Sequence, residues 1–378
     1  MKKRIEVVDA LRGFSLLGIL IANMLSFQYA NVTLEAVGPD TWWDKGAFYF
    51  TKILVEGSFY PIFGFLFGYG IILFVRSLEN RELKMRGPLW RRAIGLMVLG
   101  ILHIVFVWDG DILLTYGSAL LIFMLFLKRK VKTILIWSVT LIVLTIPLLL
   151  MEEEFLQLTL TETKEMAAVF SSGAYWDVVQ QRILGWTEMP VVVMVITLLL
   201  TVGFFSVFSF FIIGPFVLLG MAAAKVNFFT NIEDKVGLLK RLSLLIPIGL
   251  ALKASVLWAH PVGKVLNGTG AYLLAIGYIA AFTFIFVSVR ESNLSQAFVN
   301  LGRLSLTNYL MQSIICTTIF YGYGLGFFGE LGVALGLVIA VVLYSLQLLL
   351  ANVYAQRFSI GPVEWVLRKF VYLGNGRG

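Results

Sequence analysis

Residues 7–23 read VVDALRGFSLLGILIAN, an apolar run that opens with Asp9 and Arg12 and reaches Asn23 after a single hydroxyl, Ser15. Asp9 and Arg12 are three residues apart, so they share one side of a helix and can pair. Asn23 follows Arg12 by eleven residues, about three helical turns, which places it on the same side and roughly 16 Å deeper. The stretch predicts a membrane-crossing helix with a charge pair at its mouth and an amide inside. This face is either functional, or it consists of an interfacial arginine anchor paired for solvation and an asparagine that holds two helices together.

The composition of the whole chain agrees with this interpretation. Of its 378 residues, 59% are hydrophobic and 14% are charged, and the mean hydropathy is +0.89. Soluble domains have about 45–50% apolar and about 25% charged residues. The first apolar run is longer than a usual signal-peptide core and lacks a clear cleavage site, so it is taken as a membrane span. With Cys316 as its one cysteine, the chain cannot form an intrachain disulfide.

The apolar segments predict an all-α fold, a polytopic transmembrane helical bundle of about ten spans that forms a single domain over residues 1–378. The sixth segment is long and contains Gly203, Gly214 and Pro215, which fits one tilted or kinked helix as well as two half-helices. One helix is preferred, because two would break the alternation of positive charge. The predicted spans cover residues 13–30, 47–75, 93–108, 112–127, 133–151, 190–224, 242–259, 271–289, 305–321 and 331–354.

The distribution of positive charge predicts the orientation of the bundle. With the N-terminus inside, 24 of the 30 Lys and Arg residues fall in cytoplasmic segments, as the positive-inside rule requires. Both termini are then cytoplasmic, in a multi-pass protein of the plasma membrane. The net charge of +8 reflects this topology and contact with anionic lipids, so nucleic acid is not an expected partner.

Two segments lie outside the predicted spans. Residues 152–189 begin with three glutamates and contain Trp176 and Trp186. This extracytoplasmic segment is read either as an amphipathic helix on the outer interface or as a solvated loop. Residues 358–373 predict a short interfacial helix on the cytoplasmic side, with Pro362 in its first turn and Glu364 near its N-terminus.

The stretch LHIVFVWDGDILLTYG, residues 102–117, is the first candidate for chemistry. His103 lies in the third span, and Asp109 and Asp111 flank the Gly110 turn that leads into the fourth. A carboxylate from this hairpin can orient the imidazole, and such a histidine can act as a general base near neutral pH. The alternative is a histidine that only packs against a neighbouring helix, with both aspartates solvated at the turn.

Further polar residues inside predicted spans are candidates for substrate contacts, because such residues are costly in hydrocarbon. Asn308 and Gln312 are four residues apart and form a polar stripe, while Lys253 and Glu56 each need a partner. The stripe either lines a cavity or holds helices together. The glycines of FGFLFGYG, residues 63–70, favour close helix packing.

The sequence predicts no metal site. Its two histidines, His103 and His260, lie far apart, and only one thiol accompanies them. This arrangement lacks the ligand spacing of a zinc site.

Five motifs occur in a characteristic order along the chain: VVDALRGFSLLGILIAN, FYPIFGFLFGYG, RRAIGLMVLGILHIVFVWDGDIL, GRLSLTNYLMQS and GPVEWVLRKFVY. Together they resemble the YeiB-type family of polytopic membrane proteins. The opening motif, with its deeper asparagine, is also distantly similar to the start of heparan-α-glucosaminide N-acetyltransferase. It further resembles bacterial membrane O-acyltransferases, in which a histidine follows the arginine by eleven residues.

This wider resemblance implies an enzyme that takes acyl groups from cytoplasmic acyl-CoA and delivers them across the bilayer. It places Arg12, held by Asp9, at the entrance for the donor. Because position 23 is Asn and cannot be a general base, His103 with Asp109 or Asp111 must supply that role, and Asn23 is expected to bind an oxyanion. Further phosphate contacts are expected from arginines near the cytoplasmic side: Arg91, Arg92 and Arg303.

Three functions are compatible with the residues. The first is transfer of an acyl group to a small-molecule, glycan or lipid acceptor at the outer face. The second is a transporter, or a protein that moves lipids or small molecules, and uses the same polar path. The third is a structural or sensory partner protein. Membrane lipids are expected partners in each case, and assembly into a homo-oligomer is left open.

Overall fold

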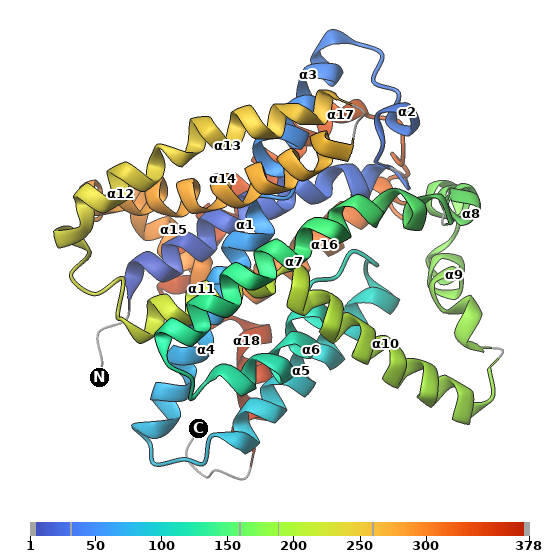
Figure 1. The fold of residues 1–378 in the computed structure, drawn as a ribbon. Coiled ribbons are helices and arrows are strands. Elements are labelled where there is room, and N and C mark those ends of the chain that lie inside the picture. The colour runs from blue at the N-terminus through green and yellow to red at the C-terminus, as the bar shows by residue number, and fades with distance from the viewer. Residues whose placement is uncertain (1–4, 31, 159, 188, 259–260, 374–378) are drawn as a thin grey trace.

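The computed structural model describes residues 5–30, 32–158, 160–187, 189–258 and 261–373, and within them it contains helices and no strand (Figure 1). Five helical segments in this part of the chain are long and apolar enough to cross a membrane. They are α1 (Glu6–Gln28), the composite segment Trp42–Glu79, α5 (Arg86–Phe106), α14 (Pro261–Ser288) and α17 (Gly332–Ala355). The protein is therefore an all-helical membrane protein.

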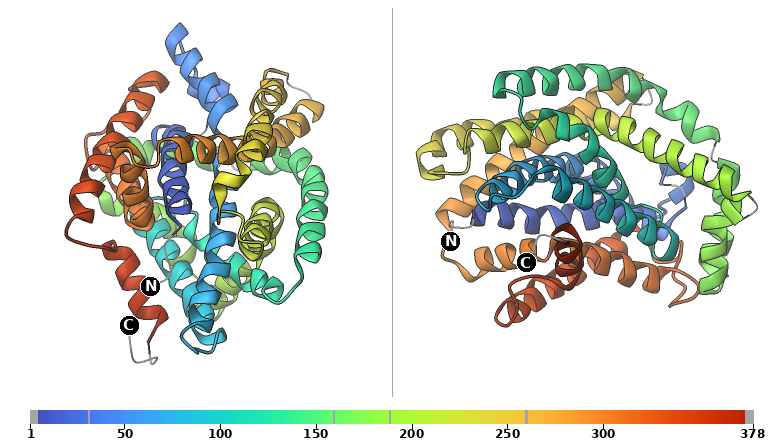
Figure 2. Two further views of the ribbon diagram at one scale, coloured as in Figure 1. Left: turned by 90° about the vertical axis from the view of Figure 1, so that its left-hand side faces the viewer. Right: turned by 90° about the horizontal axis from the view of Figure 1, so that it is seen from below.

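Helix α1 lies at the centre of the molecule, with other helices around it (Figure 2). Its closest neighbour is α15 (Asn293–Arg303), and glycines make that approach possible. A Cβ atom on Gly302 would lie 1.7 Å from the carbonyl oxygen of Asp9, and one on Gly13 would lie 2.3 Å from that of Phe298. The two backbones therefore touch beside the Asp9–Arg12 pair.

The second apolar segment is divided into α3 (Trp42–Phe50), a π-helical turn (Thr51–Val55) and α4 (Phe59–Glu79). Helix α4 packs closely on α11 (Gly214–Lys225): a Cβ atom on Gly68 would lie 1.9 Å from the carbonyl oxygen of Val217. A Cβ atom on Gly220 of α11 would likewise lie 1.9 Å from the carbonyl oxygen of Phe65 in α4. Gly68 of the FGFLFGYG motif therefore serves helix packing, as expected, whereas Gly70 lies beside the Arg12 guanidinium.

The predicted sixth span, residues 190–224, forms two helices. Helix α10 (Val191–Ile212) is followed by α11 at a bend of 66°. Gly214 and Pro215 begin α11, and a proline at this position removes a backbone donor from the helical ladder. The sequence therefore predicted the kink correctly but not its sharpness. The two helices together make a sixth candidate span.

Several other helices differ in length from the predicted spans. Helix α1 starts at Glu6 and not near residue 13, so Asp9 and Arg12 lie within its first two turns. The predicted span 242–259 consists of the short α13 (Leu245–Lys253), preceded by α12 (Val236–Ser243) and followed by a 3-10 turn. The hairpin partner of α5 is α6 (Leu113–Phe123) with a 3-10 turn behind it, and the predicted ninth span contains α16 (Ser305–Phe320).

The segments outside the predicted spans are also helical. Helix α7 (Val131–Leu158) extends past the predicted end of the fifth span, and α8 (Leu160–Ser172) and α9 (Tyr175–Thr187) follow it. Near the C-terminus, α18 (Pro362–Val371) has a proline at its start and Glu364 in its first turn. The side chains of Glu152–Glu154 are not among those that the structure describes. The interpretation of residues 152–189 as an interfacial helix depended partly on them.

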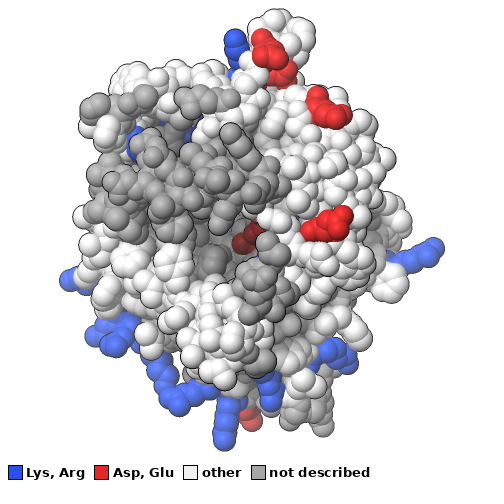
Figure 3. Space-filling model, turned by 90° about the vertical axis from the view of Figure 1, so that its right-hand side faces the viewer, with Lys and Arg blue, Asp and Glu red and all other residues white. Residues whose placement is uncertain are grey.

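Charge is unevenly distributed over the surface. On the face shown in Figure 3, most basic side chains lie toward the lower end, and acidic side chains lie mainly in the upper half. Figure 1 places both ends of the chain at the same lower end. The described surface between the two regions on this face is mostly uncharged, as expected for a protein surrounded by lipid.

Candidate functional site

A histidine and an aspartate form a buried pair between α5 and α6. Nδ1 of His103 lies 2.9 Å from Oδ1 of Asp111, and their side chains are 1% and 0% exposed. Of the two aspartates that the sequence offered, Asp111 is therefore the partner, and Asp109 is exposed at the turn. Because an ionised carboxylate only accepts hydrogen bonds, Nδ1 of His103 carries the hydrogen and Nε2 is left as a base.

Asp111 is held in place by the start of α6. Its other oxygen, Oδ2, accepts a hydrogen bond of 2.7 Å from the backbone N–H of Leu114, one of the donors that a helix N-terminus leaves without an internal partner. Gly100 of α5 allows this approach, since a Cβ atom there would lie 2.4 Å from the Leu114 nitrogen and 2.7 Å from Oδ2. The carboxylate is thus oriented by the backbone before it orients the imidazole.

The other ring nitrogen of His103 is buried and has no hydrogen-bond partner in the described chain. Two aromatic rings lie beside the imidazole, with centroid distances of 6.4 Å to Trp108 and 5.4 Å to Tyr309. A buried polar atom without a partner is costly, and in native proteins it often marks a site where a ligand or water binds. Nε2 of His103 is therefore positioned to accept a proton from a bound molecule.

Tyr309 of α16 links this pair to the rest of the site. Its hydroxyl accepts a hydrogen bond of 3.2 Å from the backbone N–H of Ile112 and donates one of 3.4 Å to the carbonyl oxygen of Gly110. The residue thus holds the turn that contains Asp111. Sequence reasoning missed Tyr309, although it lies between Asn308 and Gln312; the available signal was a phenol inside an apolar span, which needs a partner.

A cavity of about 440 Å³ begins next to Tyr309. Seven helices supply its walls: α1, α4, α5, α6, α15, α16 and α18. Most of the lining is apolar, and three arginines from different helices also line it: Arg12, Arg92 and Arg303. Residues predicted as donor contacts from three distant parts of the sequence therefore meet around one space.

The charges around the cavity do not all balance one another. Nη1 of Arg12 lies 2.9 Å from Oδ1 of Asp9, which confirms the predicted pair, and Nε of Arg303 lies 3.9 Å from Oδ2 of Asp9. Arg92 lies over the ring of Phe74 at 5.0 Å. Within the described chain, the Nε atoms of Arg92 and Arg303 are buried without a hydrogen-bond partner. An anion would satisfy these donors.

The remaining carboxylate at the cavity, Glu364, is engaged by the start of α16. It accepts hydrogen bonds from the backbone N–H groups of Leu306 and Thr307, at 2.7 and 3.1 Å, and from the Thr307 hydroxyl at 2.5 Å. The last helix, α18, is thereby fixed across the cavity. The cavity thus has three guanidinium groups, those of Arg12, Arg92 and Arg303, and two carboxylates, those of Asp9 and Glu364. Positive charge is therefore in excess.

Other predicted site residues lie away from the cavity. Arg91, next to Arg92, donates to the carbonyl oxygen of Leu373. Asn23 is partly buried, does not line the cavity, and makes no hydrogen bond with a described residue. Its predicted contact with an oxyanion stays a prediction.

Glu56 and Lys253 were expected to need partners, and each has one. Lys52 pairs with the Glu56 carboxylate at 2.8 Å. Lys253, which is fully buried, donates to the Glu56 backbone carbonyl and lies 3.4 Å from the Ser58 hydroxyl. A role for either residue in substrate binding stays a prediction.

The polar stripe on α16 makes contacts between helices. The Gln312 amide donates to Gln347 of α17 at 2.7 Å, and the Gln347 amide donates to the carbonyl oxygen of Asn308 at 3.1 Å. The Asn308 amide donates to the carbonyl oxygen of Leu304, one helical turn earlier, at 2.9 Å. These contacts match the interpretation as helix packing, and neither Asn308 nor Gln312 lines the cavity.

Among the residues that the structure describes, no group of three or more His, Cys, Asp or Glu side chains is arranged to hold a metal ion. The site chemistry available there comes from an imidazole, a carboxylate, a phenol and guanidinium groups.

Comparisons with known proteins identify similar chains. A family model described as "Protein of unknown function (DUF418)" matches residues 223–374. "Uncharacterized protein YxaH" of Bacillus subtilis (strain 168) is 34% identical over 98% of this chain and 95% of its own length. "Uncharacterized protein YeiB" of Escherichia coli (strain K12) is 27% identical over 99% of this chain and 98% of its own length. The similarity to both therefore extends over nearly the whole protein.

Proposed function

The chain belongs to the YeiB-type family of membrane proteins, and from the geometry of its site we propose that it is a transmembrane acyltransferase that uses acyl-CoA. One arrangement supports this proposal above all. The buried His103–Asp111 pair contacts Tyr309, and Tyr309 lines a cavity that carries three arginines. His103 and Asp111 do not line this cavity themselves, and Tyr309 is the residue that contacts both the base and the anion-binding space.

The cavity has the properties expected of a binding site for the donor. Acyl-CoA carries phosphates, which guanidinium groups bind through paired hydrogen bonds. Arg92 and Arg303 each have a buried Nε without a partner in the described chain, and Arg12 lies across the same space. The many apolar side chains that line the cavity suit the uncharged part of such a molecule.

His103 is the group that would move the proton. In this proposal its Nε2 takes the proton from a hydroxyl or amine of the acceptor, while Asp111 stabilises the imidazolium that forms. The acceptor oxygen or nitrogen then bonds to the acyl carbon, and the carbon–sulfur bond breaks with its electron pair on sulfur. His103 returns the proton to that sulfur, which leaves as the free thiol of CoA. The place that related acyltransferases give to a histidine is occupied by Asn23, which can only bind the oxyanion.

The proposed topology has about ten spans, with both termini in the cytoplasm of a cell bounded by the plasma membrane. Support comes from the basic side chains that gather toward the end where the chain begins and ends. Shorter apolar helices, Leu113–Phe126 and Val131–Thr145, add to the long ones as candidate crossings. The donor cavity, which Ile5 and Ile360 also line, would open toward the cytoplasm.

The test uses the full chain in phosphatidylcholine nanodiscs. Binding of acetyl-CoA is measured at equilibrium, and release of free thiol is followed with hydroxylamine as an artificial acceptor. The proposal expects saturable binding and thiol release that falls about 100-fold or more in His103→Gln. Absence of acetyl-CoA binding, together with equal thiol release by wild type and His103→Gln, would overturn it.

A transporter is the second candidate, and Lys253 is the observation that favours it. This buried cation is hydrogen-bonded to neutral groups, the Glu56 carbonyl and the Ser58 hydroxyl, and buried charges in membrane proteins often couple to substrate movement. Counterflow of a labelled solute in proteoliposomes that contain no acyl donor would support transport over transfer.

A further inference from the structure

A second group of buried donors lies outside the arginine-lined cavity, at the guanidinium of Arg182. This residue belongs to α9, and its guanidinium carbon lies 5.7 Å from the ring centroid of Phe170 and 5.8 Å from that of Tyr321. The two rings stack on each other at 4.8 Å with planes 14° apart. The Gly322 N–H donates to the Phe170 carbonyl at 2.8 Å, which ties α8 to the loop after α16.

Arg182 is attached to the helix that carries the proposed base. Its Nη1 donates to the carbonyl oxygen of Val105 at 3.4 Å, and the Tyr175 hydroxyl donates to that of Phe106 at 2.8 Å. Val105 follows His103 by two residues, about 3 Å along the axis of α5. The guanidinium therefore lies at the C-terminal end of α5, further along the helix than His103.

The Tyr321 hydroxyl faces the side edge of this guanidinium, and the Asp109 carboxylate lies near the same hydroxyl. Nε and Nη2 of Arg182 are both buried without a hydrogen-bond partner in the part of the chain that the structure describes, and so is the Tyr321 hydroxyl. Nε and Nη2 form the pair that binds two oxygens of a carboxylate or phosphate side by side. Shielded donors without a well-formed hydrogen bond to the described residues are expensive to keep, unless a ligand supplies the oxygens.

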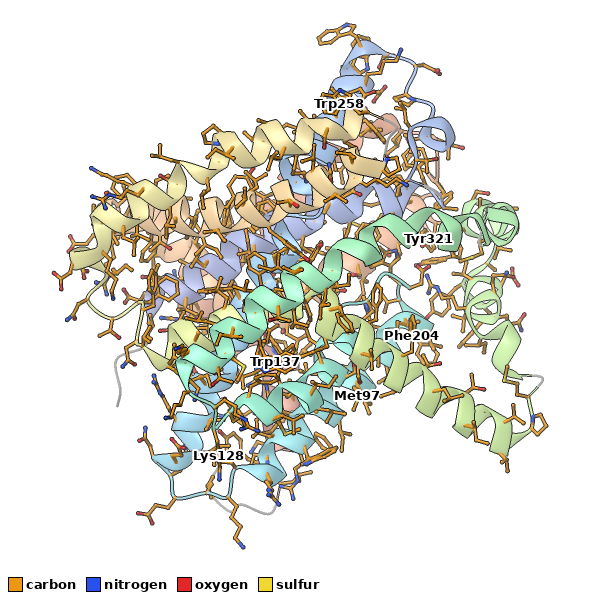
Figure 4. The ribbon with its side chains drawn as sticks, in the orientation of Figure 1. Met97, Lys128, Trp137, Phe204, Trp258 and Tyr321 are labelled. Carbon is orange, nitrogen blue, oxygen red and sulfur yellow. The ribbon has the colours of Figure 1, made fainter. Side chains whose placement is uncertain are left out.

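We propose that Arg182 and Tyr321 bind an oxyanion, a phosphate or carboxylate group, that belongs to the acceptor. The stacked rings hold the guanidinium in one plane, and the Tyr321 hydroxyl supplies a further donor beside it. Figure 4 shows Tyr321 in the upper half of the molecule and Lys128 in its lower part, so this site does not lie at the basic lower end.

The assignment to the acceptor depends on the proposed function, whereas the oxyanion site depends only on the contacts of Arg182 and Tyr321. In an acyltransferase, an anionic group held at Arg182 would bring a neighbouring hydroxyl or amine of the same molecule to Nε2 of His103. The acceptor would then be an anionic molecule, such as a phosphate-bearing lipid or glycan or a small carboxylate-bearing compound. A neutral sugar would lack the group that this site binds.

Hydrogen–deuterium exchange of the full chain in phosphatidylcholine nanodiscs tests the site, with inorganic phosphate as the probe and chloride at equal ionic strength as the reference. Phosphate is expected to slow exchange in α9 and in residues 317–326. In Arg182→Lys, which keeps the charge and loses the planar pair of donors, the apparent Kd for phosphate should rise about tenfold or more. In Tyr321→Phe it should rise less, because one neutral donor is lost and the ring remains.

Controls separate this site from general charge effects and from the donor cavity. Lys45→Gln removes an exposed cation on α3 and should leave the phosphate effect on α9 unchanged. Discs that contain phosphatidylglycerol should slow exchange in α9 without added phosphate if the natural oxyanion is a lipid headgroup, and should leave the phosphate effect intact if it is soluble.

Equal phosphate effects in wild type and Arg182→Gln, or no effect on α9 in either lipid, would overturn the proposal. Coenzyme A is tested in the same way at residues 86–96 and 298–309, around the donor cavity. If coenzyme A does not slow exchange around the donor cavity but phosphate still slows exchange in α9, the result counts against the acyltransferase and supports the oxyanion site. If coenzyme A slows exchange around the donor cavity but phosphate has no effect on α9, only the oxyanion site is ruled out.

Discussion

Asp111 contacts His103 through one carboxylate oxygen and the first turn of α6 through the other, at 2.9 and 2.7 Å. The aspartate is thus fixed by backbone geometry and not by the histidine alone. Asp109, two residues earlier, is exposed. The two carboxylates of the WDGD turn therefore have different environments, which makes them a matched pair for mutagenesis.

Replacement of Asp111 should impair transfer far more than replacement of Asp109. In Asp111→Asn the amide can donate to Nδ1 of His103, which favours the tautomer that carries its hydrogen on Nε2 and abolishes the base. We expect thiol release from acetyl-CoA to fall about 100-fold or more, with acetyl-CoA binding retained. Asp109→Asn should keep activity within about threefold of wild type. Equal losses in the two variants would contradict the assignment of Asp111.

The three arginines at the cavity should each contribute to donor binding. Loss of one guanidinium contact to a phosphate is expected to weaken CoA binding about tenfold, or about 1.4 kcal/mol. We therefore expect Arg12→Gln, Arg92→Gln and Arg303→Gln each to raise the Kd, measured by equilibrium titration in nanodiscs. Arg91→Gln is the matched control, since Arg91 is adjacent to Arg92 and does not line the cavity. A Kd raised as strongly in Arg91→Gln would count against the cavity as the donor site.

Glu364 should stabilise the fold through the N-terminus of α16. Its carboxylate accepts two backbone hydrogen bonds and one from Thr307, and charge-assisted bonds of this kind contribute about 1.5–3 kcal/mol. Glu364→Gln keeps the shape of the side chain and removes its charge. We therefore expect the free energy of unfolding to fall by about 1–2 kcal/mol, with a lower midpoint of thermal unfolding in detergent. Glu291→Gln, at an exposed carboxylate, is the control and should leave the midpoint unchanged. An unchanged midpoint in Glu364→Gln would show that α18 is not fixed in this way.

The contact between α1 and α15 should tolerate no side chain at Gly302. A Cβ atom there would meet the Asp9 carbonyl oxygen at 1.7 Å, so the two backbones must separate in Gly302→Ala. We expect the free energy of unfolding to fall by about 1–3 kcal/mol or more, the usual cost of an overpacked contact. Gly203→Ala is the control: beyond its own helix, no atom of the described residues lies within 4 Å of its Cβ position, and alanine favours a helix over glycine by about 1 kcal/mol. Thermal unfolding of both variants should give midpoint shifts of opposite sign, and a fold as stable in Gly302→Ala would refute the tight contact.

Local sequence patterns predicted the features that depend on neighbours along the chain. The i, i+3 spacing of Asp9 and Arg12 predicted their pair, because a helix brings such residues to one side. The Gly214–Pro215 step predicted a bend, because proline interrupts the helical ladder. The bounds were less accurate: the run at 242–259 is apolar enough to be read as one span, yet it forms two shorter helices and a turn.

The sequence alone determined that this is a helical membrane protein of the YeiB type, because hydropathy, helical spacing and ordered motifs are properties of the linear chain. It offered two aspartates to His103, and only packing selected Asp111, since the start of α6 orients one carboxylate and leaves the other exposed. Only the tertiary structure brought Arg12, Arg92 and Arg303 to one cavity, and Tyr309, Arg182 and Tyr321 to the region of His103. These residues lie on different helices, and their proximity depends on how the helices cross, which no local pattern encodes.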